Sequence, residues 1–188
     1  MNDYKYVDLI LGKQCQTKMG RGGIHPLEFK TFSKEMQNAI TNYCQAGGNF
    51  FVSGAYVASD LWDNRLVKAN EEDKKFAMEV LKYKWRVGQA ARNGKVKSVA
   101  SPFPEITGSY TYYQDLNPES YVVESPDALE PAAQGAFTIL RYSENNLSAG
   151  IAYKGNYKTC VLGFPFEAIR TVTERELLMK AILTFFEH

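Results

Sequence analysis

Cysteine, net charge and long apolar runs are all scarce in this sequence. Its 188 residues include three cysteines without a CxxC spacing, so neither a disulfide framework nor a zinc site is indicated. A net charge of +1 gives no reason to expect nucleic acid or an anionic membrane as a partner. The chain has no apolar stretch long enough to span a bilayer and no signal peptide at its start, although a mature fragment of a secreted protein would look the same. We expect no metal and no cofactor.

What the sequence has in quantity is aromatic residues. It contains twelve tyrosines and eleven phenylalanines, and many of the tyrosines cluster between Tyr110 and Tyr121. A tyrosine has an apolar ring and a polar hydroxyl, so such residues suit surfaces that bind carbohydrate or protein. Tyrosine and phenylalanine also favour β-strands, so ordinary strand packing is the alternative interpretation. The length of the chain fits a single domain with a full core, residues 1–188.

The first part of the chain reads as a strand–helix–strand unit, which predicts two parallel neighbouring strands with a right-handed crossover. The predicted segments are a strand over residues 6–11, a loop over 13–29, a helix capped by Thr31 or Ser33 that stops at Gly47-Gly48, and a strand over 49–53. Two further helices are expected. They cover residues 55–62 and 74–84, and residues 85–88 close the second.

From about Gly94 the apolar pattern changes to a period of two, which is typical of strands. The predicted strands cover residues 96–99, 109–114, 121–123, 136–142, 147–153 and 157–163, and a final helix begins near Thr173. The last strand is nearly continuous in apolar residues, as a central strand would be. The pattern predicts a three-layer α/β fold with a mixed sheet. Strands 6–11, 49–53 and 157–163 would form a parallel core, and residues 95–153 an antiparallel extension.

Several segments carry a resemblance to a known fold. They are DLILGKQ at 8–14, YCQAGGNFFVSGAYVASDL at 43–61, YKWRVGQAA at 83–91, SAGIAY at 148–153, VLGFPFEAI at 161–169 and LLMKAILTFF at 177–186. The chain resembles the class I glutamine amidotransferase-like fold, which is flavodoxin-like. More narrowly, it resembles the C-terminal domain of bacterial secreted proteins labelled xanthan lyase. The resemblance implies a domain cut from a larger secreted, periplasmic or cell-surface protein. A shared fold does not imply a shared reaction.

The residues that the resemblance makes catalytic are missing. Active relatives have a cysteine at the turn after the second strand, where this chain has Ser53 and Gly54. They have the motif Gln-Phe-His-Pro-Glu after the last strand, where this chain has Gly163-Phe164-Pro165-Phe166-Glu167. The acid, Glu167, is kept, and an apolar residue replaces the histidine. A serine nucleophile needs a base within hydrogen-bond reach, and the two histidines are His25, in the early loop, and His188, at the tail. The alternative interpretation is a turn of small residues that lets strand and helix pack closely.

Other charged residues admit functional and structural interpretations. Asp60 lies shortly after the turn, where it could serve a catalytic serine or cap a loop. The acidic run at residues 71–73 is typical of a solvated face. Arg86 follows Trp85 in apolar surroundings, which predicts a buried arginine paired with Glu167 or Asp60.

Two functions from different classes remain open. One is a non-catalytic accessory or binding domain of a carbohydrate- or cell-wall-directed protein, with polysaccharide or peptidoglycan fragments and other domains of the parent protein as partners. Its candidate ligand-binding residues are Tyr56, Tyr110 and Tyr112. The other is a hydrolase that uses Ser53 with Glu167 or Asp60. Geometry discriminates between them, because the hydrolase needs the serine hydroxyl within about 3.2 Å of an acid or base in an open cleft.

Overall fold

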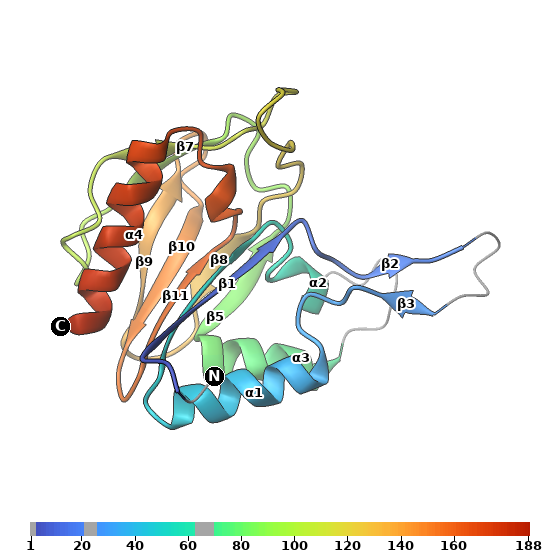
Figure 1. The fold of residues 1–188 in the computed structure, drawn as a ribbon, viewed down its shortest axis with the longest axis vertical. Coiled ribbons are helices and arrows are strands. Elements are labelled where there is room, and N and C mark those ends of the chain that lie inside the picture. Colours follow the sequence, from blue (N-terminus) through green and yellow to red (C-terminus); the bar gives the residue numbers. More distant parts are fainter. Residues whose placement is uncertain (1–2, 21–25, 63–69) are drawn as a thin grey trace.

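The centre of the molecule is a sheet in which parallel and antiparallel strands are joined. The computed structural model describes residues 3–20, 26–62 and 70–188 (Figure 1). Within these residues the main sheet has seven strands in the order β1-β4-β11-β10-β9-β6-β7. Their bounds are Tyr6–Gly12 for β1, Asn49–Gly54 for β4, Lys158–Leu162 for β11, Ser148–Lys154 for β10, Ala136–Tyr142 for β9, Lys95–Ser98 for β6 and Ser109–Thr111 for β7.

The parallel part of this sheet consists of three strands. β4 pairs in parallel with β1 on one side and with β11 on the other, so that Val52 lies opposite both Leu9 and Val161. Each successive pair from β11 through β10, β9 and β6 to β7 is antiparallel. The predicted parallel core with an antiparallel extension is therefore confirmed. β4 is buried from Phe50 to Gly54, which accounts for its uninterrupted run of apolar and small residues.

The helices begin where the sequence supplies caps. The main ones are α1 (Lys34–Gln45), α2 (Ser59–Trp62), α3 (Glu71–Phe76) and α4 (Val172–Glu187), with a π turn η2 (Ala77–Leu81) and a 3-10 turn η3 (Phe166–Ala168). The Ser33 hydroxyl accepts a hydrogen bond from the Met36 amide at 3.3 Å, so Ser33 rather than Thr31 caps α1. A capping box between Thr171 and Glu174 starts α4.

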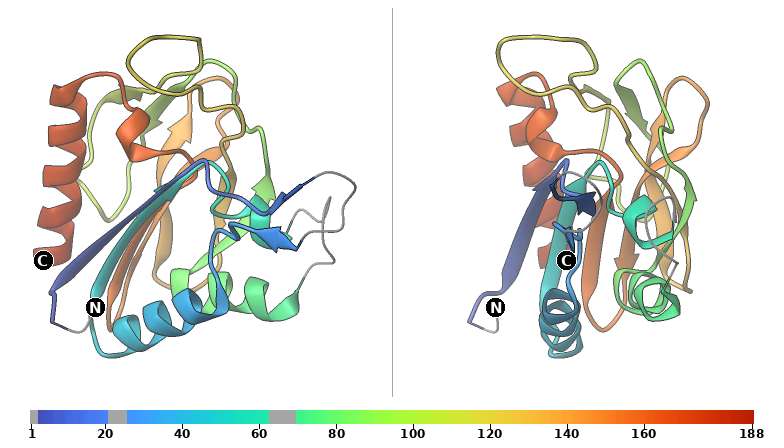
Figure 2. Two further views of the ribbon diagram at one scale, coloured as in Figure 1. Left: turned by 45° about the vertical axis from the view of Figure 1, so that its right-hand side comes forward. Right: turned by 90° about the vertical axis from the view of Figure 1, so that its right-hand side faces the viewer.

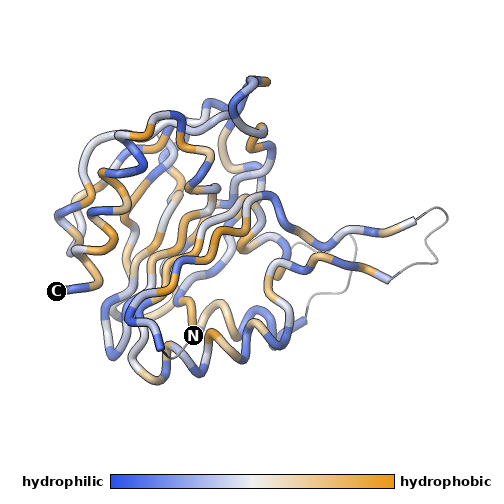
Figure 3. Tube along the Cα trace, viewed as in Figure 1, coloured by the Kyte–Doolittle hydropathy of each residue, from blue (hydrophilic) through white to orange (hydrophobic). Residues whose placement is uncertain are grey.

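Two core clusters use opposite faces of the strands. Phe51 and Cys160 belong to the cluster that includes the apolar face of α4, whereas Phe50, Val52 and Val161 belong to the cluster that includes α1. Neighbouring residues of one strand enter different clusters because side chains alternate across a sheet. Figure 3 shows hydrophobic residues running along the strands between the helices.

The segment after the second predicted helix differs from expectation. Residues 83–87 form a strand, β5 (Tyr83–Val87). It pairs antiparallel with β8 (Ala128–Pro131). The sequence pattern did not reveal β8. Lys82 takes a left-handed backbone conformation with φ 68°, which ends the π turn and redirects the chain. Residues 121–123, expected as a strand, lie outside the strands.

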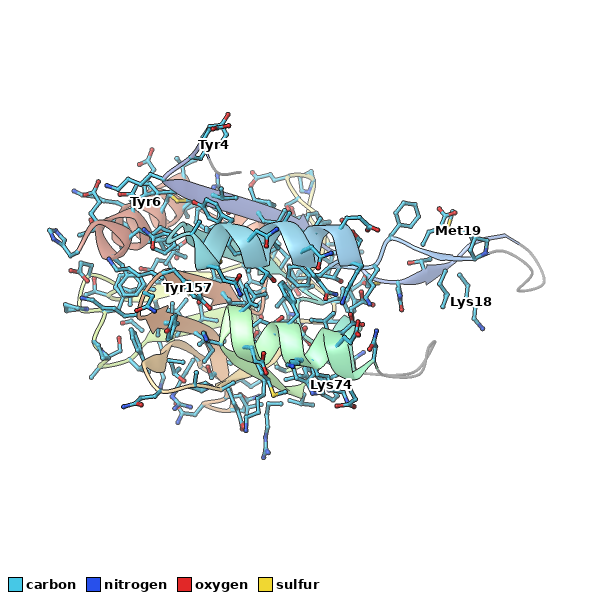
Figure 4. All side chains as sticks on the ribbon, turned by 90° about the horizontal axis from the view of Figure 1, so that it is seen from below. Tyr4, Tyr6, Lys18, Met19, Lys74 and Tyr157 are labelled. Atoms are coloured by element: carbon cyan, nitrogen blue, oxygen red, sulfur yellow. The ribbon has the colours of Figure 1, made fainter. Side chains whose placement is uncertain are left out.

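The early loop contains a small hairpin that extends away from the sheet (Figure 1). Its strands are β2 (Thr17–Lys18) and β3 (Leu27–Glu28), which pair antiparallel. Figure 4 shows Lys18 and Met19 on this projection, beyond the ends of α1 and α3. No helix among the described residues is long and apolar enough to cross a membrane.

Candidate functional site

The place where a catalytic turn would lie is at the carboxyl ends of the parallel strands, which is where open α/β sheets bind ligands. Ser53, near the end of β4, is fully buried. Its hydroxyl oxygen accepts a hydrogen bond from the Phe166 amide at 3.2 Å. Phe166 in turn packs edge-on against Phe51, with ring centroids 5.8 Å apart. Apolar rings therefore fill the space in which a substrate would meet the serine.

No acid or base reaches Ser53 within the described part of the chain. Neither of its two proposed carboxylate partners, Glu167 and Asp60, forms a hydrogen bond with its hydroxyl. Of the two histidines, His25 lies outside the described residues, and His188 is exposed at the end of α4. The serine hydroxyl is consequently held as a structural acceptor in this conformation.

The turn after β4 is as tight as its small residues suggested. A Cβ atom added at Gly54 would lie 3.0 Å from the Cβ of Leu11 and 3.2 Å from a methyl group of Val57. The next amide, at Ala55, donates to the Gly12 carbonyl at 2.9 Å. Gly54 thus allows β1, β4 and the following turn to approach each other. The first amide after β4, that of Ala55, already has a hydrogen-bond partner.

A buried aspartate binds two of the amides that follow β4. One carboxylate oxygen of Asp127 accepts hydrogen bonds from the amides of Ala58 and Ser59, at 2.8 and 2.9 Å. It also accepts from the Ser59 hydroxyl at 3.2 Å. In an active acyl-transfer site, amides at such a turn would remain free to stabilise an oxyanion. Here a carboxylate of the protein already binds the amides of Ala58 and Ser59.

Sequence reasoning missed Asp127. Burial raises the pKa of this carboxyl group to about 7, and the hydrogen bonds from Ser59 and Ala58 oppose the shift. The available signal was an acid directly before the apolar pair Ala128-Leu129, but the pattern alone does not say which distant amides would pair with it.

Glu167, the acid to which the sequence resemblance pointed, has a tyrosine as its partner. One of its carboxylate oxygens accepts from the Tyr121 hydroxyl, and the other is buried without a hydrogen bond from the described residues. A Cβ atom at Gly12 would lie 3.3 Å from both the glutamate and the tyrosine oxygens, so glycine makes room for this pair. Partial burial and then the charge of Glu167 raise the pKa of Asp8 to about 6, although Asp8 as a residue remains solvent-exposed.

Asp60 holds the base of the β2–β3 hairpin. Its two carboxylate oxygens accept from the Gln16 amide at 2.9 Å, and from the Thr31 amide and hydroxyl at 2.8 and 2.7 Å. This is the loop-capping role that the sequence left open. Arg86, expected to be buried beside Asp60 or Glu167, is instead exposed. Its Nε atom lies 3.6 Å from a carboxylate oxygen of Glu130 on β8.

The expected exposed tyrosine pair is not found. Tyr110 and Tyr112 are 3% and 0% exposed, and the Tyr112 ring stacks on Phe164 at 4.9 Å. Both rings belong to the core, because the backbone of β7 turns them toward the cluster under α4. Tyr113 faces the other way and lies under the Arg170 guanidinium at 5.1 Å. Tyr56 is half-buried beside the turn and packs against the same core cluster.

Metal ligands do not gather in the part of the chain that the structure describes. No group of three or more histidine, cysteine, aspartate or glutamate residues there could hold an ion. Cys44 and Cys160 are buried free thiols, and burial raises the pKa of Cys44 to about 12. Neither thiol is therefore a nucleophile.

Comparison with known proteins gives a fold but no family. No family model matches the sequence, and no curated protein matches it. A beta-galactosidase from Rahnella sp. R3 is similar in structure, with a TM-score of 0.57 and 12% identity over 99% of this chain and 23% of that chain. The chain thus spans less than a quarter of the length of that glycosidase.

Two further structures are more distantly similar. They are the exo-beta-1,4-mannosidase Op5Man5 from Opitutaceae bacterium strain TAV5, with a TM-score of 0.45 and 11% identity over 81% of this chain and 22% of that chain, and the N-terminal domain of mmIFT52, with a TM-score of 0.41 and 14% identity over 83% of this chain and 72% of that chain.

Proposed function

We propose that residues 1–188 form one non-catalytic domain with a class I glutamine amidotransferase-like fold, which serves as an accessory or binding domain in a larger protein. The observation that carries the proposal is the occupied turn after β4. The amides of Ala58 and Ser59 are taken by the carboxylate of Asp127, and Ser53 is buried under Phe166. A site in which donors and nucleophile are already satisfied has nothing left to offer a transition state.

The setting that we propose for this domain is a secreted, periplasmic or cell-surface protein directed at carbohydrate or the cell wall. The sequence resemblance to the C-terminal domain of secreted proteins labelled xanthan lyase supports this setting. The structural likeness to a portion of a beta-galactosidase is compatible with it, but at 12% identity that likeness concerns the fold alone. Polysaccharide or peptidoglycan fragments are the ligands that the proposal expects.

The ligand-binding part of the proposal is tested by titrating the chain with plant and cell-wall polysaccharide fragments in a calorimeter. We expect Tyr56→Ala to weaken binding at least tenfold, since Tyr56 is the half-buried ring beside the turn. Tyr4→Ala is the matched control, because Tyr4 is an exposed ring that precedes the opposite end of β1. Absence of binding to every fragment would overturn the carbohydrate-binding function.

The alternative is a hydrolase that uses Ser53 with Glu167 or Asp60. It requires the serine hydroxyl to leave the Phe166 amide and Glu167 to leave Tyr121. We expect no glutamine hydrolysis above buffer and no hydrolysis of the polysaccharide fragments. Ser53→Ala should keep the fold and change neither result. Turnover by the wild-type chain that disappears in Ser53→Ala would establish the hydrolase instead.

A further inference from the structure

β1 is an edge strand of the main sheet, and no described strand pairs with its outer side. β4 is its one neighbour in the sheet order. The Asn49 amide donates to the Lys5 carbonyl, and the register pairs Tyr6 with Asn49, so the backbone groups of residues 5, 7 and 9 point toward β4. Backbone direction alternates along a strand. The N–H and C=O groups of Tyr6, Asp8 and Ile10 therefore point outward, and no described residue hydrogen-bonds to them.

A groove of about 640 Å³ lies along α4. Its apolar lining consists of Phe166, Val172, Met179 and Leu183, and its rim of polar and charged residues consists of Arg175, Glu176, Lys180, Thr184 and Glu187. Phe186, on the adjoining side of α4, stacks on Tyr6 with ring centroids 5.7 Å apart. Figure 2 (right) shows β1 at the margin of the sheet beside α4. Tyr6, Asp8 and Ile10 project on this same side, and Ile10 is 51% exposed.

The middle of the edge carries two acidic side chains, Asp8 and Glu167, and neither forms a salt bridge with a described residue. Asp8 lies near Glu167, whose second carboxylate oxygen has no hydrogen-bond partner among the described residues. The lysines near the two ends of β1 are engaged elsewhere. Lys5 lies over the Tyr6 ring at 5.0 Å, and Lys13 pairs with Glu124 at 3.1 Å. A strand that adds to β1 must therefore bring a basic side chain opposite Asp8, with apolar side chains two residues before and after it.

We propose that the free edge of β1 and the α4 groove together bind an extended segment of the pattern apolar–x–Lys/Arg–x–apolar, supplied by an adjoining domain of the larger protein. The proposal rests on the proposed function in one respect, namely that this chain is a domain of such a protein. Backbone groups of Tyr6, Asp8 and Ile10 would form the ladder, and the apolar side chains of the segment would fill the groove.

A second copy of the chain does not satisfy this edge. A two-fold antiparallel pairing through the outward-facing groups places Asp8 opposite Asp8, Tyr6 or Ile10, and none of these supplies a cation. The symmetric arrangement would bring the two aspartates to a Cα separation of about 5.5 Å, where like charges repel. The edge is thus selective for a different, basic strand.

The test tethers a seven-residue segment with the core Val-Thr-Lys-Thr-Val to the start of the chain through a flexible Gly/Ser linker. Tethering raises its effective concentration to about millimolar. We expect amide hydrogen exchange at Tyr6, Asp8 and Ile10 to slow at least tenfold. The slowing should be lost when glutamate replaces the lysine of the segment, and in Ile10→Lys. Leu177→Lys is the matched control, because Leu177 is 59% exposed on another side of α4 and should leave the slowing intact.

Three outcomes would overturn the inference. These are no slowing at the three amides, equal slowing by the lysine and glutamate segments, and an untethered chain that sediments as a dimer abolished by Ile10→Lys. Melting curves of each variant verify that it is folded. Because this readout uses no carbohydrate, a failure of polysaccharide binding would contradict the ligand proposal without affecting the hydrogen-exchange result at the edge of β1.

Discussion

At the scale of single residues, the turn after β4 separates a structural role from a catalytic one. Gly54 sits where added atoms would meet Leu11 and Val57 at 3.0 and 3.2 Å. Its backbone φ is outside the left-handed range, so close approach rather than special backbone geometry requires glycine here. Ser53, one residue before Gly54, is fully buried.

We therefore expect Gly54→Val to destabilise the fold by roughly 1–3 kcal/mol, because β1 and the following turn must move apart. In a chain of this size that cost corresponds to a fall of several degrees in melting temperature. Thermal unfolding followed by circular dichroism measures it. Gly88→Val is the control, because the φ of Gly88 lies outside the left-handed range and the nearest atom to a Cβ added there is 3.6 Å away, an ordinary van der Waals contact. A Gly54→Val protein with an unchanged melting temperature would show that the turn is not tight.

The buried carboxyl group of Asp127 should make stability depend on pH. Its pKa is about 7 in the folded state and near 3.8 when solvated, so between these values the folded state binds more protons than the unfolded state. The free energy of unfolding contributed by this group therefore falls as pH rises from about 4 to 7, with a slope of up to about 1.4 kcal/mol per pH unit. Asp8, with a pKa of about 6, acts in the same direction.

Asp127→Asn isolates this contribution, because the amide oxygen can still accept from Ala58 and Ser59 but no longer titrates. We expect the difference in unfolding free energy between the two proteins to change across pH 4–7, as measured by urea unfolding at several pH values. Parallel curves for the two proteins would mean that Asp127 is ionised in the folded state.

At the scale of elements, α4 contributes one layer of a core and one wall of the groove. Its start is fixed by the reciprocal hydrogen bonds of Thr171 and Glu174, in which the Thr171 hydroxyl accepts from the Glu174 amide at 3.1 Å. Its buried residues then anchor it to the sheet. The position of the groove follows from where α4 begins and from which of its side chains face the sheet.

Removal of the cap should loosen the beginning of α4 without unfolding the sheet. We expect Thr171→Ala to cost about 1 kcal/mol, the usual effect of losing a threonine cap. Thr173→Ala is the control, because Thr173 lies two residues after Thr171 and is also exposed. It should cost a few tenths of a kcal/mol at most. Chemical denaturation distinguishes the two, and equal losses would contradict the capping role.

At the scale of the whole molecule, the sheet has a buried centre and an open margin. β4 lies between two parallel partners, whereas β1 has one. We expect slow amide exchange throughout β4 and an alternating pattern in β1, with Val7 and Leu9 protected and Tyr6, Asp8 and Ile10 exchanging quickly. Hydrogen exchange by nuclear magnetic resonance reads each amide separately. Uniform protection along β1 in the isolated chain would mean that its outer edge is already covered.

The sequence by itself determined the parallel strands, the choice of Thr31 or Ser33 as the cap of α1, and the absence of a cysteine and a histidine at the places that the resemblance makes catalytic. These are local properties: an apolar run, a serine before a helix, or a residue type at a given place. The tertiary structure alone decided the rest. Residues 83–87 form a strand, where a helix to residue 84 and its closing segment were predicted, because they pair with a strand more than forty residues away. The burial of Tyr110 and Tyr112 depends on which side of the chain at and just after β7 meets the α4 core. Likewise, Asp127 fills the turn and Asp60 closes the hairpin through contacts between segments distant in sequence, which no local pattern specifies.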